Sequence, residues 1–458
     1  MLKSFDLPDC TYDQNQPTLI CPITPTPTHK LYLSNLDDQK FLRFSIKYLY
    51  VFRKSANKQA LKDSLSRVLV QYYPLAGRLR RCTQNDDHKL EIDCNGQGAV
   101  FAEANMDLCA DEFLKFAVKP NRSLIKLLHR VEAPDFLDIP PLVIQVTNLR
   151  CGGMVLSTAI NHCVCDGIGT SQFLHAWAHM HQSSSHLPIP PLHSRHVLKP
   201  RSPLQVNFPH NGFTKSTPGE LNPQTTLNIH KYLQSQPLVP ASITFSPSQV
   251  LHLKRQCSSS LKCTSFEVLA SHTWRCWVKS LGLPLSIPVK LLFSVNIRNK
   301  LSPELPQGYY GNGFVLACAE AKVNELVAPN LHDAVKLVQH AKSRITYDYV
   351  QSMIDLLQDG SIRTDLSRSL VISQWSKLGL EELDFGEGKP LHMGPLTSDI
   401  YCLFLPIIEE SNAIRVLVSM PESIVDKFQF YMTEFFGVVQ NGDARTHYEV
   451  DNLKMVLV

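Results

Sequence analysis

The chain has 458 residues, and 44% of them are hydrophobic. This length exceeds what one hydrophobic core normally organises, so it predicts two domains of roughly 200 residues each. Its 45 basic residues are scattered among 41 acidic ones with no block of like charge, so the sequence argues against a nucleic-acid-binding or membrane-surface protein. The N-terminus lacks the apolar run of a secretory signal, and no segment approaches the roughly 18 apolar residues of a membrane span, so we expect a soluble, cytoplasmic protein.

The first half of the chain contains helix and strand patterns in alternation. Residues 60–73 place apolar side chains at helical spacing, and Pro74 ends this predicted amphipathic helix. Residues 142–149 and 154–160 are rich in branched side chains and are joined by a short Gly-containing turn, which predicts a β-hairpin. Residues 170–180 return to helical spacing, so a second helix follows the hairpin closely.

A change of composition divides the chain. Residues 183–228 are rich in Pro, Ser, His and Asn, which is typical of a long crossover without regular structure. We therefore predict an N-terminal domain over residues 1–182, a linker over 183–228 and a C-terminal domain over 229–458.

The second half uses the same kinds of element, so both predicted domains belong to the α/β class. Thr264 and Glu267 have the spacing of a capping box, which marks the start of a helix that runs through Trp274. The other elements predicted here are a strand over 289–296, a long helical segment over 331–357, a strand over 413–419 and a last helix striped by Ile424, Phe428, Met432 and Phe435.

The stretch MVLSTAINHCVCDGIGT, residues 154–170, carries the strongest chemical signal. Its apolar strand breaks at His162, an aspartate follows four residues later at Asp166, and Gly167 comes directly behind it. A loop held between a strand and a helix is a common place for a reactive side chain. A histidine near neutral pH can take a proton from an alcohol, so the pattern favours general-base catalysis.

Three other interpretations of this histidine compete with catalysis. His162, Cys163, Cys165 and Asp166 resemble metal ligands, but their spacing matches no zinc motif, so we predict no metal site. A thiolate nucleophile at Cys163 or Cys165 is weakened because adjacent residues of an extended segment point apart, and in a reducing cytosol most of the 13 cysteines are expected to be small buried residues. A buried, hydrogen-bonded structural histidine stays as the third alternative.

With these residues the chain resembles the plant BAHD acyltransferases. Their hallmark H-x-x-x-D-G is matched by residues 162–167, and their second hallmark D-F-G-W-G is matched by residues 384–388, with Glu387 in place of the tryptophan. The resemblance extends in the family's order over nearly the whole chain, through the stretches YYPLAGRL at 72–79, PPLHSRHVLKPRSP at 190–203, TSFEVLASHTWR at 264–275, SVNIRNKLSPELPQGYYGNGF at 294–314 and LVSMPESIVDKF at 417–428.

The resemblance implies a fold and a reaction. It implies two chloramphenicol acetyltransferase-like domains with a solvent channel between them, into which acyl-CoA and the acceptor enter from opposite mouths. His162 is then the general base that deprotonates the acceptor hydroxyl for direct attack on the thioester, with no covalent acyl-enzyme. The chain is expected to be a monomer that uses acyl-CoA as a co-substrate and holds no permanent cofactor.

The resemblance also implies supporting roles for other residues. Asp166 is expected to point away from the channel and to pair with Arg298, so its role, like that of Gly167, is structural. The glycines of the second hallmark allow the backbone to turn near the CoA channel. The remaining residues implied are Asp384, Gly386 and Gly388 as structural support, and Thr264, Ser265 and Ser294 as contacts of CoA.

Two departures from the family pattern bear on the substrates. Glu387 replaces a large indole with a carboxylate, and we interpret it as a surface substitution next to Lys389. The Y-F-G-N-C block of anthocyanin acylation is not present, which disfavours a flavonoid glycoside acceptor and a malonyl donor. We expect transfer of an aromatic acyl group, hydroxycinnamoyl or benzoyl, to an alcohol; the alternatives are N-acylation of an amine, acylation of a fatty alcohol or hydroxy fatty acid, and an inactive binding protein.

Overall fold

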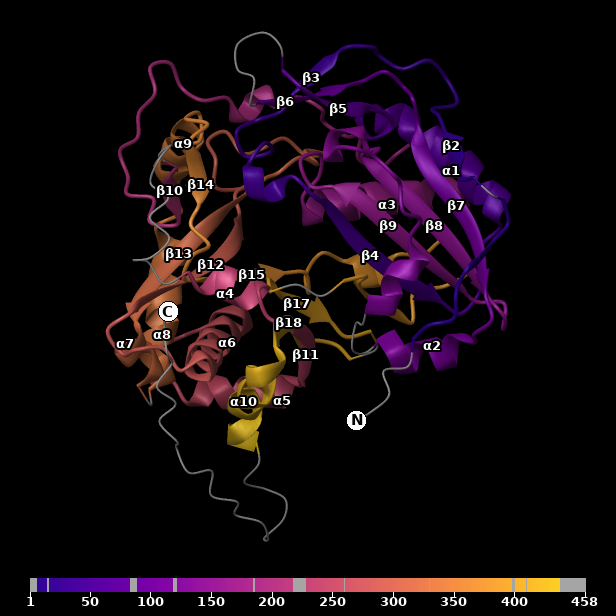
Figure 1. Cartoon of the computed structure of the whole chain (residues 1–458). Helices are drawn as coiled ribbons and strands as arrows, with labels where there is room; N and C mark the ends of the chain where they lie inside the picture. Colours follow the sequence, from indigo (N-terminus) through magenta and orange to yellow (C-terminus); the bar gives the residue numbers. More distant parts are fainter. Residues whose placement is uncertain are drawn as a thin grey trace.

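The computed structural model places two β-sheets side by side, one from each half of the chain (Figure 1). It describes residues 6–14, 16–82, 89–117, 122–183, 186–216, 228–258, 260–328, 330–397, 400–408 and 410–436. No helix in these ranges combines the length and the hydrophobicity that crossing a bilayer requires.

The N-terminal sheet has seven strands in the order β1-β7-β8-β9-β4-β16, with β2 also paired to β7. Its strands from the first half of the chain are β1 (Thr11–Tyr12), β2 (Thr18–Ile20), β4 (Ser45–Phe52), β7 (Ala99–Met106), β8 (Leu142–Leu149) and β9 (Met154–Asn161). A small three-stranded sheet stands beside it, made of β3 (Lys30–Tyr32), β6 (Leu90–Asp93) and β5 (Arg78–Arg81).

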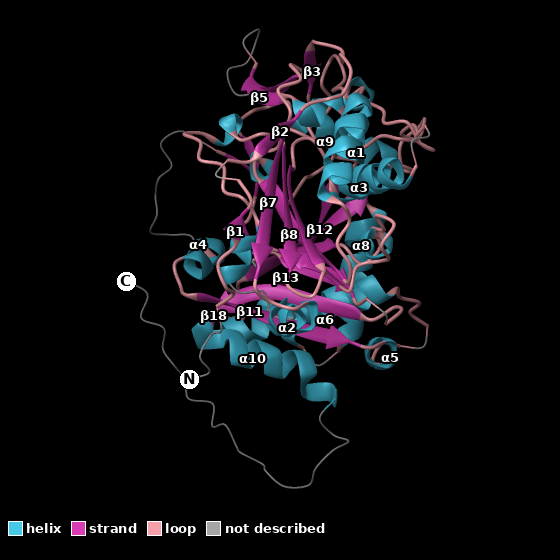
Figure 2. Ribbon diagram, turned by 90° about the vertical axis from the view of Figure 1, so that its right-hand side faces the viewer, coloured by secondary structure: helices cyan, strands magenta, loops and turns pink. Residues whose placement is uncertain are grey.

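Helices cover both faces of the N-terminal sheet. On one face, α1 (Lys58–Gln71) and α3 (Gly167–Gln182) lie side by side (Figure 2), and the buried indole of Trp177 in α3 donates to the Leu61 carbonyl of α1 at 3.2 Å. On the opposite face, α2 (Ala110–Ala117) packs Phe113 against side chains of β4 and β7. The strand β9, which ends directly before His162, is consequently buried along its whole length.

The C-terminal sheet has six strands in the order β11-β18-β17-β15-β12-β13. These strands are β11 (Leu238–Phe245), β12 (Pro288–Asn296), β13 (Phe314–Lys322), β15 (Ser369–Gln374), β17 (Cys402–Pro406) and β18 (Ile414–Pro421). The helices of this half are α4 (Ile229–Gln234), α5 (Pro247–Arg255), α6 (Ser265–Leu281), α7 (Val323–Val327), α8 (Leu331–Ser343), α9 (Tyr347–Leu356) and α10 (Glu422–Thr433).

One strand crosses between the two halves. β16 (His392–Pro395) belongs to the C-terminal half by sequence, yet it pairs antiparallel with β4 at the edge of the N-terminal sheet. The chain then returns to the C-terminal sheet as β17. The halves are thus interlocked, and the domain limits at residues 182 and 229 stay a prediction.

Most predicted elements are present, with three differences. The helical segment 331–357 is two helices, because the side chain of Thr346 caps a new start by accepting from the Tyr349 amide. The crossover 183–228 contains the short strand β10 (Phe213–Lys215), which pairs with β14 (Ile362–Thr364); residues 184–185 and 217–227 of this prediction lie outside the described residues. The last helix ends at Thr433, so Phe435 lies in a following 3-10 turn.

The first turn of α3 packs against the C-terminal half without room for a side chain at Gly169. A Cβ at this position would lie 1.8 Å from the Tyr310 carbonyl oxygen. We therefore expect Gly169→Ala to lower the free energy of unfolding by about 3 kcal/mol, since a backbone atom cannot yield as a flexible side chain does.

Urea unfolding measures this effect, and Gly360→Ala is the matched control because a Cβ there meets nothing within 4 Å. The control is expected to change stability by no more than about 0.5 kcal/mol. Equal midpoints for the two variants would show that the α3 contact is looser than described.

Candidate active site

His162 is the first residue after β9, and its backbone is held at the strand end. Its amide donates to the Phe44 carbonyl at 2.9 Å, which is one more rung beyond the β4–β9 ladder. Asn161 then closes a turn, because its side-chain oxygen accepts from the Cys163 amide at 3.0 Å and its carbonyl accepts from the Val164 amide at 3.0 Å. The sequence break at His162 is therefore a tight turn into α3.

Asp166 ends this turn and is the N-cap of α3. One carboxylate oxygen accepts from the Gly169 amide at 2.8 Å, and the other accepts from the Gly313 amide at 3.0 Å. Arg298 adds a bidentate ion pair with N–O distances of 2.9 and 3.0 Å. None of these four contacts is made with His162, so the carboxylate is engaged in holding the turn.

A second arginine, which the sequence did not reveal, holds the same turn from the other side. Arg195 is fully buried, donates to the Val164 carbonyl at 2.8 Å and lies 4.0 Å from the Asp37 carboxylate. Asp37 in turn accepts from the Asn312 amide at 2.8 Å and side chain at 3.0 Å. The same Asn312 side chain donates to the His162 carbonyl at 2.8 Å. The backbone that carries the histidine is thus fixed by Asp37, Asn312 and Arg195.

The signals for these residues in the sequence are weak. Arg195 stands in the predicted linker, and a single basic residue there is normally solvated. Its burial depends on the rings of Tyr309 and Tyr310, whose centroids lie 5.1 and 4.5 Å from the guanidinium carbon. Such a contact joins residues more than a hundred positions apart, so only the tertiary structure reveals it.

The imidazole of His162 stands partly exposed between two phenylalanine rings. The centroids of Phe44 and Phe314 lie 5.4 and 6.0 Å from that of the imidazole. Burial of the ring lowers the pKa of His162, and the neighbouring Asp166, Asn312 and Asp37 counteract the shift in part. The neutral, proton-accepting form is therefore favoured at neutral pH.

The two cysteines of the motif are unsuited to nucleophilic catalysis. Cys163 and Cys165 are fully buried, and this burial raises the pKa of each thiol well above its usual range. A thiol kept protonated is a poor nucleophile. In the described part of the chain, no group of three or more His, Cys, Asp or Glu side chains is arranged to hold a metal ion.

A cavity of about 490 Å³ opens in front of His162, between the two sheets. Most of its wall is apolar, and the stacked pair of Tyr48 and Trp375, with centroids 4.5 Å apart, contributes to it. Its other main lining residues are Phe41, Phe44, Ile46, Ser294, Phe314, Leu316, Val371, Ser373, Thr397, Tyr401 and Leu403. This space suits an apolar or aromatic group next to the imidazole.

A larger cavity of about 950 Å³ adjoins it and shares Ser294 in its wall. Thr264, Ser265 and Ser294, the residues expected to contact CoA, all line this one cavity. Thr264 also forms the predicted capping box with Glu267 at the start of α6. Four lysines border the cavity, namely Lys300, Lys342, Lys377 and Lys389.

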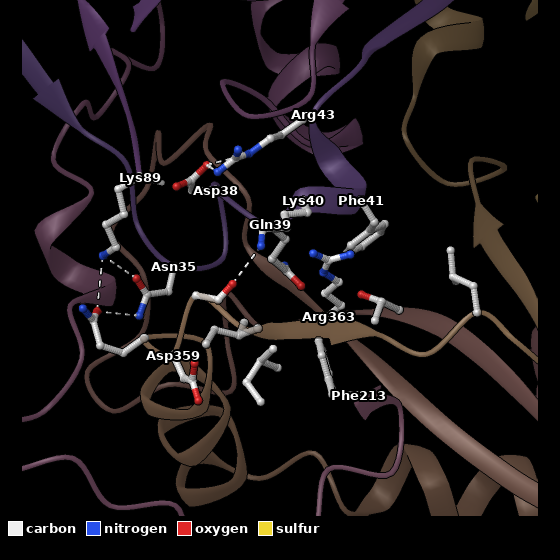
Figure 3. Close-up of a pocket in the computed structure, with 16 residues that line it drawn as sticks. Asn35, Asp38, Gln39, Lys40, Phe41, Arg43, Lys89, Phe213, Asp359 and Arg363 are labelled. Carbon is white, nitrogen blue, oxygen red and sulfur yellow. Dashed lines mark hydrogen bonds and ion pairs between the residues drawn. The ribbon is translucent and has the colours of Figure 1, made fainter. Parts of the chain in front are cut away.

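A third cavity of about 270 Å³ adjoins the His162 cavity at Phe41 (Figure 3). Its cations differ in their contacts: Lys40 donates to the Gly360 carbonyl at 2.8 Å, whereas Arg43 pairs with Asp38. The exposed Arg363 extends toward Phe41 in the same view. The three cavities therefore follow one another, with His162 in the middle one.

The second hallmark, residues 384–388, is a structural turn. The Asp384 side chain accepts from the amides of Gly386 and Gly388 at 2.7 and 3.0 Å, and both glycines have positive φ, at 93° and 100°. The ring of Phe385 is buried against Trp177 of α3, with centroids 4.9 Å apart. Glu387 is exposed and lines none of the three cavities described above.

The family model described as "Transferase family" matches residues 13–434 of the chain. An omega-hydroxypalmitate O-feruloyl transferase of Arabidopsis thaliana is 36% identical over 430 residues, which cover 91% of each protein. A fatty alcohol:caffeoyl-CoA acyltransferase of the same plant is 35% identical over 94% of this chain and 100% of its own length.

Solved structures share the fold. Vinorine synthase superposes with a TM-score of 0.70 at 20% identity, covering 93% of this chain and 98% of its own. The TRI101 protein of F. graminearum, in complex with coenzyme A and deoxynivalenol, gives a TM-score of 0.70 at 16% identity, covering 87% of this chain and 96% of its own. The predicted α/β class and its acyltransferase-like architecture are confirmed.

The contacts of Asp166 predict a variant whose main defect is stability. Asp166→Asn removes the charge that compensates the largely buried Arg298 and turns an acceptor into a donor that faces N–H groups. We expect the free energy of unfolding to fall by ~3 kcal/mol, the usual cost of leaving one partner of a buried ion pair alone.

Chemical unfolding and steady-state kinetics on the same preparation check this expectation. Asp107→Asn is the matched control, because its ion pair with Arg150 lies on the surface. If Asp166→Asn unfolds like the parent but has lost its turnover, then the carboxylate acts on the imidazole directly and the structural assignment is wrong.

Proposed function

Because the chain belongs to the BAHD acyltransferases of the Transferase family, we infer that it is an acyl-CoA-dependent O-acyltransferase in which His162 is the general base. One observation carries the assignment of the base. His162 lies in the wall of an apolar cavity whose neighbour, across Ser294, is larger, more polar and bordered by lysines. The donor and the acceptor can therefore approach the same imidazole from two sides.

In the proposed reaction the acceptor oxygen attacks the thioester directly, without a covalent acyl-enzyme. The neutral imidazole accepts the proton of the acceptor hydroxyl while the oxygen attacks the thioester carbonyl and a new C–O bond forms. The tetrahedral intermediate collapses, the C–S bond breaks, and the imidazolium returns the proton to the CoA sulfur. A base of this kind contributes ~10²- to 10⁴-fold, so orientation of both substrates in the cavity supplies much of the remaining acceleration.

The surroundings of His162 favour one tautomer for this role. Nδ1 of His162 and the side-chain oxygen of Asn312 are both buried and lack a hydrogen-bond partner among the described residues, and the Asn312 side chain counteracts the lowered pKa of the imidazole. The Asn312 amide is oriented by the two bonds of its nitrogen, to Asp37 and to the His162 carbonyl. A proton on Nδ1 facing the Asn312 oxygen leaves Nε2 as the base. Asn312 then orients the ring, which is the task that Asp166 does not perform.

We assign acyl-CoA to the cavity of about 950 Å³ and its acyl group to the apolar space in front of His162. The stacked Tyr48 and Trp375 suit an aromatic acyl group, as in the feruloyl and caffeoyl transfers for which two relatives are named. The acceptor is assigned to the side of Phe41, where the third cavity begins. Its class is an alcohol with a long apolar body, like the fatty alcohol and omega-hydroxypalmitate of those names.

The alternatives receive less support. The position of Glu387, outside the three cavities, gives no reason to prefer a cationic amine as the acceptor. The structured turn around His162 argues against an inactive binding protein. A monomeric state and a cytoplasmic location complete the proposal.

A direct assay tests the function. The purified chain is incubated with feruloyl-, caffeoyl-, benzoyl- or malonyl-CoA and with 1-hexadecanol, 16-hydroxyhexadecanoic acid, benzyl alcohol or an aliphatic amine. Release of the CoA thiol and mass spectrometry of the ester are measured together. We expect hydroxycinnamoyl esters of the long-chain alcohols; amide products would overturn the acceptor class, and intact donors in every mixture would overturn the enzymatic assignment.

The role of His162 predicts both a rate and a pH effect. His162→Ala is expected to lower kcat by about 100-fold or more with little change in the KM for acyl-CoA, because the base acts in the transition state. The parent should lose activity as the pH falls through the pKa of the imidazole, since protonation removes the base. Burial lowers this pKa, so the acidic limb should lie below pH 6.5, the ordinary value for histidine.

His186→Ala serves as the control, because His186 is exposed outside the site. A His162→Ala variant that keeps more than a tenth of the parent kcat would remove this residue from the role of base. A limb well above pH 6.5 would contradict the proposed effect of burial.

The lysines of the larger cavity predict the donor phosphate contacts. Lys342 and Lys389 pair with Glu267 and Glu382, whereas Lys377 is exposed and has no ion-pair partner in the described part of the chain. We expect Lys377→Gln to raise the KM for acyl-CoA about fivefold and to leave the KM for the acceptor unchanged, because a charge-assisted contact with phosphate is lost.

Initial rates over a matrix of donor and acceptor concentrations measure both constants. Lys54→Gln, which removes another exposed lysine that lines none of the three cavities, should leave them as in the parent. An increase in the acceptor KM alone would exchange the proposed places of the two substrates.

A further inference from the structure

A pair of cysteines lies at the far end of the β8–β9 hairpin, outside the three cavities. Cys151 is exposed in the turn between β8 and β9, and Cys109 comes directly before the first residue of α2. The two segments are joined by the Arg150 amide, which donates to the Leu108 carbonyl at 3.1 Å. Neither cysteine takes part in the proposed acyl transfer.

The contacts of the two sulfur atoms place them side by side. The Ala110 amide donates to the Cys151 sulfur at 3.2 Å. This amide nitrogen is bonded to the Cys109 carbonyl carbon, so the Cys151 sulfur lies no more than about 6 Å from the Cys109 Cα. The Cys109 side chain also interacts with the Cys151 sulfur and lowers the pKa of Cys151. A disulfide requires Cα atoms within ~7 Å and sulfurs that can meet. The contacts of Ala110 with Cys151 and of Arg150 with Leu108 bring the two cysteines into the same neighbourhood.

The surroundings favour the thiolate of Cys151. Its sulfur accepts from the first amide of α2, where the helix dipole stabilises negative charge. The Ala110 and Gly153 amides, with the Cys109 side chain, lower the pKa of Cys151 although partial burial opposes them. The guanidinium of Arg150, whose Nη2 lies 3.7 Å from the Cys109 sulfur, adds positive charge. It also pairs with Asp107 and Glu112, which face the same corner.

A second pair of neighbouring cysteines, Cys257 and Cys263, lies in an environment that disfavours the thiolate. Cys257 is buried and Cys263 is partly buried, and burial raises the pKa of Cys257 to about 11. The other exposed cysteine, Cys21, contacts the Gln97 carbonyl at 3.7 Å and lies near the Arg78 guanidinium, and its sulfur accepts from no backbone amide in the described part of the chain. Proximity, exposure and amide donors therefore coincide at Cys109 and Cys151.

We propose that Cys109 and Cys151 form a redox-sensitive dithiol, which peroxide converts into a disulfide that ties the β8–β9 turn to α2. The Cys151 thiolate attacks hydrogen peroxide; an S–O bond forms, the O–O bond breaks, and hydroxide leaves as water. The Cys109 sulfur then attacks the sulfenic sulfur; the S–S bond forms, the S–O bond breaks, and a second water leaves. The two thiols lose two electrons, and one peroxide is reduced to two waters.

Alkylation rates test the activation of Cys151. The full-length protein is treated with limiting iodoacetamide at pH 7, and the labelling of each cysteine is followed by peptide mass spectrometry. Cys151 is expected to react at least fivefold faster than Cys21, the matched exposed cysteine, because the Ala110 amide at the start of α2 stabilises the Cys151 thiolate. Equal rates for the two residues would overturn the proposal.

Oxidation tests the cross-link itself. Brief treatment with stoichiometric hydrogen peroxide should remove two thiols per chain, yield a peptide linked through Cys109 and Cys151, and raise the Tm by about 5 °C, because the bridge constrains the unfolded chain. Dithiothreitol should reverse all three changes.

Two serine variants separate the roles of the cysteines. In Cys109→Ser, dimedone should trap a sulfenic acid at Cys151. In Cys21→Ser, the cross-link should form as in the parent. A parent in which Cys151 advances to sulfinic acid without the linked peptide, or in which Cys21 is oxidised first, would contradict the proposal.

Discussion

The ion pair between Asp166 and Arg298 is the constraint on which the site depends. Two guanidinium N–H groups and two backbone amides converge on one carboxylate that is almost without solvent. Such a charge is stable in a low-dielectric interior only when its partners are complete and well oriented. Because Arg298 and Gly313 belong to the C-terminal half, the turn after β9 acquires its conformation only when the two halves are docked.

A second set of buried charges completes this constraint. Arg195 and Asp37 hold the Val164 carbonyl and, through Asn312, the His162 carbonyl. Both ends of the turn are therefore fixed before any substrate binds, which is the preorganisation that a general base needs. This fixed arrangement leaves little room for larger side chains next to the turn, because a Cβ at Gly169 would lie 1.8 Å from the Tyr310 carbonyl oxygen.

The interlocking of the halves also explains the places of the cavities. β16 joins β4, and Phe385 inserts against Trp177, so the segment between β15 and β17 packs on the N-terminal sheet before the chain returns. The space left between the two sheets becomes the cavity in front of His162, with openings toward Ser294 and toward Phe41. The cavity is thus a property of the junction, to which both halves contribute side chains.

The sequence by itself determined most elements and pointed to His162 as the candidate base. Branched side chains around a Gly-containing turn predicted the β8–β9 hairpin, helical spacing predicted α3, and the capping box predicted the start of α6. The H-x-x-x-D-G pattern singled out His162. All these signals are local or carried by a short motif. The pairing of Asp166 with Arg298 came from the resemblance. Only the tertiary structure showed the contacts of Asp37, Arg195 and Asn312, the break between α8 and α9, and the transfer of β16 to the other sheet. Each of these depends on partners distant in the chain, and the energy of burying them is decided by packing, which no local pattern encodes.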